Sequence, residues 1–228
     1  MALQYLWWIA AAILVGVEMM TGTFYLLIVA LACVAGGIAA VAGLDVGWQW
    51  GVAAVVEVVG TLAVNPSLYP RLAYDPVKSF TPVAWVARVP NVLVVSASSP
   101  FRRLEDLLDQ ARARPGQLSY SSGGNGSAAH IAFESLKLRA GVFMLHIPYR
   151  GTAPSITDLI AGQVTATFTG APAVLPHVAS GRLRALAVSS RARLPQLPEV
   201  PTVAERGFAG FEADQWYGVV APAGTPRE

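Results

Sequence analysis

The chain has 228 residues, of which 54 % are hydrophobic and 13 % are charged, and its formal net charge is +2. Ordinary soluble domains carry about a quarter charged residues, so the composition excludes a uniformly soluble chain. The small net charge argues against a nucleic-acid partner. The single cysteine, Cys33, excludes a disulfide framework. Between Met1 and Leu44 the only charged residue is Glu18, whereas the chain from Pro66 onward has a normal globular composition. We therefore expect a membrane part followed by a soluble part.

Two apolar runs, Ala2–Met20 and Phe24–Leu44, are each long enough to cross a bilayer as a helix. The first run lacks the preceding basic residues and the following cleavage site of a signal peptide, so we expect both helices to be retained. Trp48–Val64 is a third candidate, in which the cost of placing Glu57 near the middle nearly cancels the gain from the valines. The late appearance of lysine and arginine weakly favours a cytoplasmic position for the rest of the chain.

The runs WWIAAAILVGVEMMTGTFYLLIVALACVAGGIAAVAGL and WQWGVAAVVEVVGT fill most of the first 61 positions. Together they resemble the membrane half of small NfeD-like proteins. In that family two or three hydrophobic helices precede a small β-barrel, and the barrel has no counterpart in this sequence. The resemblance implies a transmembrane domain over residues 1–62 and a separate domain over residues 63–228.

The stretch Ser119–His130 is typical of a strand end, a glycine-rich loop and a helix start. Three glycines within four positions let the backbone turn its N–H groups toward one point. Ser127 is a good N-cap, and the helix behind it places about half a positive charge at its open end. Such a loop suits a carboxylate or a phosphate. A mobile surface loop is the alternative, because glycine-rich patterns are weak signals.

Predicted strands and helices alternate around this loop, which favours an α/β fold with a largely parallel sheet and helices on its faces. The stretch from Asn65 to Pro82, by contrast, contains several proline turn dipeptides and is expected to be irregular. Periodicity and β-branched runs define the elements. The expected strands are Asn91–Ser96, Leu118–Tyr120, Met144–Tyr149, Val164–Thr169, Leu183–Ser189 and Trp216–Ala221. The expected helices are Ala129–Leu138, Ala153–Ala161, Pro172–Ser180 and the helical turn Pro201–Arg206. A further helix is expected between Pro100 and Pro115, with Leu104, Leu107, Leu108 and Ala111 on one face.

Ligands of such sheets bind beyond the carboxyl ends of the strands. The glycine-rich loop, Tyr149–Gly151 and Thr169–Gly170 all follow predicted strand ends, so we expect a small-molecule site where they converge. Arg150 can pair with a carboxylate ligand, although a structural partner explains an exposed arginine equally well.

The sequence predicts no metal, cofactor or catalytic centre. The histidines are dispersed and have no second ligand at metal-binding spacing, and we expect His130 to be a surface or packing residue. The loop also lacks the Gly-x-Ser-x-Gly pattern of a serine hydrolase.

Several motifs between about residue 60 and residue 228 belong together. They are AVNPSLYPRLAYDPVKSFTPVAWVARVPNVLVVSASSPFRRLEDLL, SYSSGGNGSAAHIAFE, HIPYRGTAPSITDLIAGQV, FTGAPAVLPHVASGRLRALAVSS, LPEVPTVAERG and WYGVVAPAGTP. This set resembles the receptors of tripartite tricarboxylate transporters, the Bug-type periplasmic solute-binding family. The resemblance implies a type II periplasmic-binding-protein-like fold of two lobes that close around a small carboxylate, and a binding protein rather than an enzyme. It further implies a second lobe over about residues 96–214 and an incomplete first lobe.

The resemblance also implies a set of ligand contacts. Loop residues would hold a ligand carboxylate through backbone N–H groups, hydroxyls and ordered water, two residues would line the opposite wall, and one would lie near the crossing between lobes. The implied loop residues are Ser122, Gly124, Asn125, Gly126 and Ser127. The implied wall residues are Tyr149 and Thr169, and the residue near the crossing is Asp214. Ser121 stands where the family usually has glycine.

Three functions remain open. The first is a solute-binding receptor for a small organic carboxylate, anchored in the bacterial inner membrane with its soluble part in the periplasm, and with transporter membrane subunits as candidate partners. The second is an NfeD-type membrane scaffold, and the third is a non-functional fusion whose truncated binding domain has no ligand. The motifs favour the first, and nucleic acid is not an expected partner.

Overall fold

The computed structural model describes residues 54–224 and the side chains from Val58 onward. The chain divides into two compact units. Unit 1 comprises Met1–Ala87 and Trp216–Glu228, and unit 2 comprises Arg88–Gln215. The expected transmembrane helices within residues 1–44 lie outside the described residues. Among the helices that are described, none combines the length and the apolar character needed to cross a membrane.

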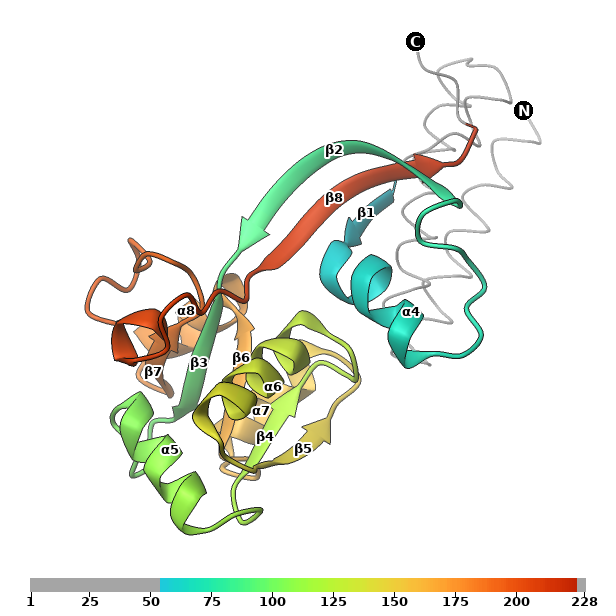
Figure 1. The fold of residues 1–228 in the computed structure, drawn as a ribbon. Helices are drawn as coiled ribbons and strands as arrows, with labels where there is room; N and C mark the ends of the chain where they lie inside the picture. Colours follow the sequence, from blue (N-terminus) through green and yellow to red (C-terminus); the bar gives the residue numbers. More distant parts are fainter. Residues whose placement is uncertain (1–53, 225–228) are drawn as a thin grey trace, which may run out of the picture. The chain divides into compact units, whose positions relative to one another are not determined.

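The described part of unit 1 is a small sheet with two short helices (Figure 1). The sheet has the order β1-β8-β2, and β1 pairs antiparallel with β8. The strands are β1 (Ala54–Glu57), β2 (Phe80–Val89) and β8 (Gln215–Pro222), and the helices are the π-helix η1 (Val59–Val64) and α4 (Asn65–Leu68).

Two predictions for this region are wrong, the second of them in part. A single membrane-spanning helix over Trp48–Val64 is wrong because its described part forms β1 and then η1; β-branched valines favour extended pairing, here with β8. The prediction of an irregular stretch over residues 65–82 holds for residues 69–79 but is wrong at its two ends, which form α4 and the start of β2. Pro66 lies in the first turn of α4, and Pro82 lies in an edge strand, the two places where proline is tolerated.

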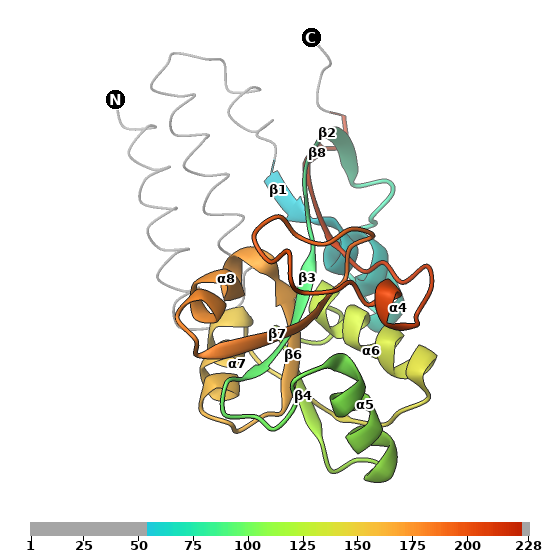
Figure 2. The same ribbon diagram turned by 90° about the vertical axis from the view of Figure 1, so that its left-hand side faces the viewer.

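Unit 2 is a five-stranded sheet with helices on both faces (Figure 2). Its strands are β3 (Asn91–Ser96), β4 (Ser119–Ser122), β5 (Leu145–Pro148), β6 (Ala166–Gly170) and β7 (Leu183–Val188). Its helices are α5 (Leu104–Ala113), α6 (Ala128–Ala140), α7 (Thr152–Ile160), α8 (Ala171–Ala179) and the 3₁₀-helix η2 (Ala204–Arg206). The elements expected between Asn91 and Val188 are all present, and those ends that the sequence predicts differ from the observed ones by at most two residues. Residues 96–214, the expected second lobe, lie inside this unit.

The sheet of unit 2 has the order β5-β4-β6-β3-β7. β4 pairs parallel with β5 and with β6, as predicted, whereas β3 pairs antiparallel with both β6 and β7. The prediction of a largely parallel sheet is therefore wrong at β3. The alternation argument treats each intervening helix as a crossover between parallel neighbours. However, α5 connects β3 to β4, which are not neighbours, so the argument does not constrain the direction of β3.

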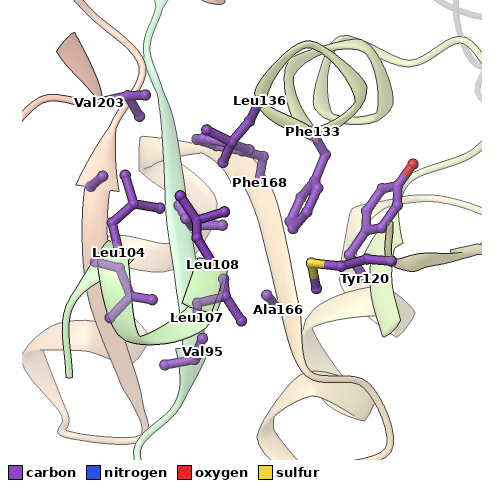
Figure 3. Packing of buried hydrophobic residues seen from close by; sticks show 14 of the residues in the cluster. Val95, Leu104, Leu107, Leu108, Tyr120, Phe133, Leu136, Ala166, Phe168 and Val203 are labelled. Atoms are coloured by element: carbon purple, nitrogen blue, oxygen red, sulfur yellow. The ribbon is translucent and has the colours of Figure 1, made fainter. Parts of the chain in front are cut away.

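The core of unit 2 has two halves, one on each face of the sheet. On one face α5 and α6 pack their buried residues against the strands, and Phe133 and Leu136 of α6 point toward Phe168 of β6 (Figure 3). On the other face α7 and α8 contribute Ile156 and Val174 to a second cluster. Because both faces are covered, all six residues of β3 are buried. This rigid sheet fixes where its strand ends lie.

Candidate functional site

The candidate site lies at one edge of the unit 2 sheet. β4, β5 and β6 run in the same direction as immediate neighbours, so their carboxyl ends share this edge. The backbone N–H of Tyr149 donates to Ser122 O at 3.0 Å, and that of Gly151 donates to Gly123 O at 3.1 Å. The segments that follow β4 and β5 are therefore in direct contact, and the segment after β6 begins at the same edge.

The glycine loop, residues 122–127, joins β4 to α6. Gly124 and Gly126 have φ angles of 136° and 77°, a region that residues with a side chain rarely adopt. A Cβ on Gly123 would lie 3.4 Å from Thr152 Oγ1, so the loop passes close to the start of α7. The predicted requirement for glycine in this loop thus follows from the backbone angles of Gly124 and Gly126.

Ser127 caps α6, as predicted. Its Oγ accepts a hydrogen bond from the His130 N–H at 3.3 Å and donates to Gly124 O at 2.8 Å. Its own N–H donates to the same carbonyl at 3.3 Å. Ser127 therefore closes the loop onto the helix.

The loop presents fewer free groups than its sequence implies. The N–H of Gly124 donates to Ser122 Oγ at 3.2 Å, and the N–H of Gly126 donates to His130 Nδ1 at 3.1 Å. The hydroxyl of Ser122 contacts Gly124 O and His146, so it is engaged inside the loop. Of the implied residues in the loop, only Asn125 has both its backbone N–H and its side chain without a hydrogen bond to the described part of the chain.

Two donors that the sequence analysis does not single out lie at the first turn of α6. The backbone N–H groups of Ala128 and Ala129 donate to no other group of the described residues. Both follow the N-cap directly, and the first N–H groups of a helix have no partner within it. The prediction of Ser127 as N-cap could have identified these two N–H groups, because they follow the cap directly. With Asn125, these amides are free donors at the start of α6, and the helix dipole reinforces them.

Tyr149 and Arg150 follow β5. The Tyr149 hydroxyl donates to Asp158 Oδ2 at 2.6 Å, and this hydrogen bond, with burial, raises the pKa of Tyr149 to about 12. The phenol is therefore a neutral donor that is already engaged. The guanidinium of Arg150 is exposed and has no acceptor among the described residues, so it is free to meet a carboxylate.

Thr169 lies near the end of β6, where it pairs with Val92 of β3. The residue is 3 % exposed, and its hydroxyl has no hydrogen-bond partner in residues 54–224. Thr169 thus lies at the same sheet edge as the glycine loop, with an available hydroxyl.

Asp214 lies on the β7 side of this edge, and its carboxylate is occupied. Its Oδ2 accepts from Arg88 Nε at 2.8 Å, and its Oδ1 accepts from Ser189 Oγ at 2.6 Å. Asn91 binds the neighbouring Ala213 carbonyl at 2.6 Å. The structure thus groups Asp214 with structural partners at the start of β3 and the end of β7, and not with the glycine loop.

Four stacked rings border the loop. The ring centroids of His130 and His146 are 4.0 Å apart, those of His146 and Tyr120 are 4.8 Å apart, and those of Tyr120 and Phe133 are 4.0 Å apart. The expectation of a surface or packing role for His130 misses its hydrogen bond to the loop, because that bond depends on the loop's backbone conformation.

Two cavities of unit 2 lie away from the glycine loop, and of the implied ligand-binding residues only Asp214 lines either of them. One, of about 410 Å³, lies beside β7 and is lined by four arginines, among them Arg184, whose guanidinium donates to the carbonyls of Ala97, Ser99 and Phe101. The other, of about 310 Å³, includes Asp214. Among the described residues no group of three histidine, cysteine, aspartate or glutamate side chains is placed to hold a metal ion.

Comparison with known proteins decides the family. A family model described as the tripartite tricarboxylate transporter family receptor matches residues 27–228. The chain belongs to this family. The matched range begins inside the stretch compared above with NfeD-like proteins, and the comparisons give that resemblance no support.

Relatives with known sequences agree with this family. The UPF0065 protein in the tcbD-tcbE intergenic region of Pseudomonas sp. (strain P51) is 47 % identical over 167 residues, which cover 73 % of this chain and 50 % of the relative. Protein BugT of Bordetella pertussis is 42 % identical over 164 residues, which cover 72 % of this chain and 50 % of BugT. The chain spans about half the length of the curated relatives it matches.

Solved structures of the family show the fold. MatC from Rhodopseudomonas palustris, with bound malate, has a TM-score of 0.71 at 31 % identity, covering 84 % of this chain and 65 % of MatC. An R. palustris protein with adipate has a TM-score of 0.67 at 42 % identity, covering 69 % of this chain and 53 % of that protein. The periplasmic binding protein BugD has a TM-score of 0.71 at 34 % identity, covering 76 % of this chain and 57 % of BugD. The chain therefore has an α/β, periplasmic-binding-protein-like fold.

Proposed function

We propose that this chain is a solute-binding receptor that binds one carboxylate of a small organic acid at the glycine loop. The observation that carries the proposal is the group of three unpartnered N–H donors, from Asn125, Ala128 and Ala129, at the positive end of α6. They lie at the sheet edge where β4, β5 and β6 end. The ligands in two structural relatives, malate and adipate, are dicarboxylates.

The other implied residues receive roles according to their free groups. We assign Arg150 to the second carboxylate of a diacid, because its guanidinium is exposed and unpaired within the described chain. Thr169 offers a hydroxyl at the same edge. Ser122, Gly124, Gly126 and Ser127 shape the loop through its internal hydrogen bonds. Asp214 and Tyr149 support the site through Arg88 and Asp158.

The setting of the receptor is part of the proposal. Structural relatives are described as a periplasmic transporter and as a periplasmic binding protein, and we propose that residues 63–228 act in the periplasm with membrane subunits of a transporter. An inner-membrane anchor within residues 1–62 stays a prediction, because residues 1–53 lie outside the described part. No observation favours the NfeD-type scaffold.

A proline substitution tests the role of the helix amides. Ala128 is the first residue of α6, where proline is tolerated, and Ser127 before it has φ −61° and ψ 155°, which suits a residue preceding proline. Ala128→Pro therefore removes one free N–H while keeping the helix start. Ala128→Ser keeps the N–H and is the matched control.

Isothermal titration calorimetry of the full chain with malate, adipate and succinate measures the effect. Acetate and glucose are the negative ligands. We expect at least one diacid to bind, and Ala128→Pro to weaken it by about 1.5–3 kcal/mol, the worth of a hydrogen bond to a charged group, which is roughly 10- to 150-fold in Kd. Equal affinities of the two variants, with equal melting temperatures, would contradict the proposed site. No heat with any diacid would contradict the function.

A further inference from the structure

Two histidines hold the inner side of the glycine loop. His130 comes from the first turn of α6 and His146 from β5, and their rings stack at 4.0 Å with an interplanar angle of 11°. The sequence separates them by sixteen positions, and only the parallel pairing of β4 with β5 brings them together. The pair lies between the aromatic core of unit 2 and the loop.

Each ring binds one loop group. The Gly126 N–H donates to His130 Nδ1 at 3.1 Å, and Ser122 Oγ lies 2.7 Å from His146 Nε2. Ser122 Oγ also accepts the Gly124 N–H. The N–H groups of Gly124 and Gly126 are therefore turned inward, whereas the N–H of Asn125, between them, stays free. Nδ1 has one lone pair, so His130 can accept the Gly126 N–H only while Nδ1 carries no proton.

Of the charged groups that face the pair, Glu134 favours a proton on the rings and Lys137 opposes it, and burial outweighs the carboxylate. Glu134 and Lys137 come from α6, and Tyr120 comes from β4. Glu134 Oε1 lies 4.0 Å from His130 Nε2, but it also accepts Lys137 Nζ at 2.6 Å and the Tyr120 hydroxyl. The ammonium of Lys137 thus offsets the carboxylate. Burial lowers the pKa of His130 below its ordinary value of 6.5. Burial, and then the neighbouring His130, lowers the pKa of His146 to about 4.

We propose that His130 and His146 are positioning residues of the carboxylate site: as a neutral stacked pair they hold the loop in the shape that leaves the Asn125, Ala128 and Ala129 amides free. This inference rests on the proposed function. Protonation of His130 removes the acceptor of the Gly126 N–H and places a positive charge against the second ring, so it releases the loop. Because burial depresses the pKa of both histidines, the neutral pair stabilises the held loop fully above pH 6.5. This stabilisation is lost as the pH falls below that value.

The test compares two substitutions of His130 in the full chain. In His130→Asn, the side-chain oxygen replaces Nδ1 as an acceptor, whereas His130→Leu has no acceptor. The readout without ligand is the hydrogen-exchange protection of the Gly126 amide, measured by NMR. We expect wild type and His130→Asn to protect this amide, and the protection factor of the amide to be at least tenfold lower in His130→Leu. With malate as probe, the Kd should rise at least tenfold in His130→Leu and less than threefold in His130→Asn.

A pH titration of the unliganded chain gives a second readout. The Gly126 amide resonance of wild type should move with a midpoint below pH 6.5, and that of His130→Asn should not. Equal Gly126 protection in wild type and His130→Leu would overturn the inference, as would an unchanged malate affinity. If wild type binds no carboxylate, the proposed function fails, whereas the Gly126 amide still decides the loop-holding role.

Folding of the variants has its own control. Should His130→Leu fail to give a native far-UV circular dichroism spectrum, His146→Gln and His146→Leu repeat the comparison, because the glutamine amide can replace Nε2 next to Ser122. The readout is then the Gly124 amide, which donates to Ser122 Oγ. We expect Gly124 to lose protection in His146→Leu only. Equal protection in both variants would contradict the proposal.

Discussion

Ser127→Ala separates the two roles of the N-cap, stabilising α6 and shaping the candidate site. The substitution removes the acceptor of the His130 N–H and the donor to Gly124 O. Loss of a serine N-cap costs typically about 1 kcal/mol. Gly124 O keeps hydrogen bonds from the Ser127 N–H and from Ser122 Oγ. Losing the bond from Ser127 Oγ therefore adds only about 0.5 kcal/mol, the low end for a hydrogen bond. We expect the free energy of unfolding to fall by about 1.5 kcal/mol.

Urea unfolding of the full chain, followed by circular dichroism, measures this loss. Ser127→Asp is the matched variant, because aspartate is an equally good N-cap but places a negative charge where the ligand carboxylate is proposed to bind. It should keep the cap but lose the donor to Gly124 O, so we expect a loss of only about 0.5 kcal/mol together with malate binding at least tenfold weaker. Ser135→Ala, inside α6 and without a side-chain hydrogen bond in the described chain, controls for the loss of a hydroxyl. If Ser127→Ala costs less than about 0.3 kcal/mol, the capping argument is refuted.

Three further predictions concern the scaffold of unit 2. Phe168→Ala should lower the free energy of unfolding by about 3–5 kcal/mol, because this ring is fully buried. Leu138→Ala, at an 85 % exposed position, should change the free energy of unfolding by less than about 0.5 kcal/mol. Urea unfolding compares the two variants, and similar losses would contradict the assigned core. Arg184→Met should cost about 1–3 kcal/mol, because three carbonyls lose their donor, and an unchanged melting temperature would exclude this role. The backbone N–H of Arg102 holds the pKa of Asp106 below 3.8, so the contribution of Asp106 to stability is present above pH 3.8 and is lost as the pH falls below it. Asp106→Asn should flatten the stability curve in that range, and thermal unfolding from pH 6 to pH 2.5 would show an unchanged slope if this carboxylate contributes nothing.

The sequence predicts the elements of unit 2 well, because each of them carries a local signal. The buried valine run of β3 and the apolar face of α5 are visible as periodicity. Strand direction is different, because β3 takes its direction from pairing with β6 and β7, strands that follow it by seventy residues or more. No local pattern encodes that choice.

The candidate site was predictable to the level of the loop but not of its individual donors. Ser127 as N-cap and the glycines of the loop follow from residue type. Which N–H groups stay free depends on the loop's backbone conformation, through the local bond of Gly126 to His130, and on His146, which reaches the loop only through the tertiary pairing of β4 with β5. Asp214 illustrates the reverse case. Its acidic side chain fits a ligand contact, yet the structure engages both of its oxygens with Arg88 and Ser189.

The central claim is that free amides at the start of α6 bind a ligand carboxylate. The most direct measurement is an NMR titration of the ¹⁵N-labelled full chain with malate and with adipate, in which the backbone amide resonances are followed. We predict saturable shifts of the Asn125, Ala128 and Ala129 amides that are larger than those elsewhere in unit 2. Saturable binding of either diacid that leaves these three resonances in place would contradict the claim.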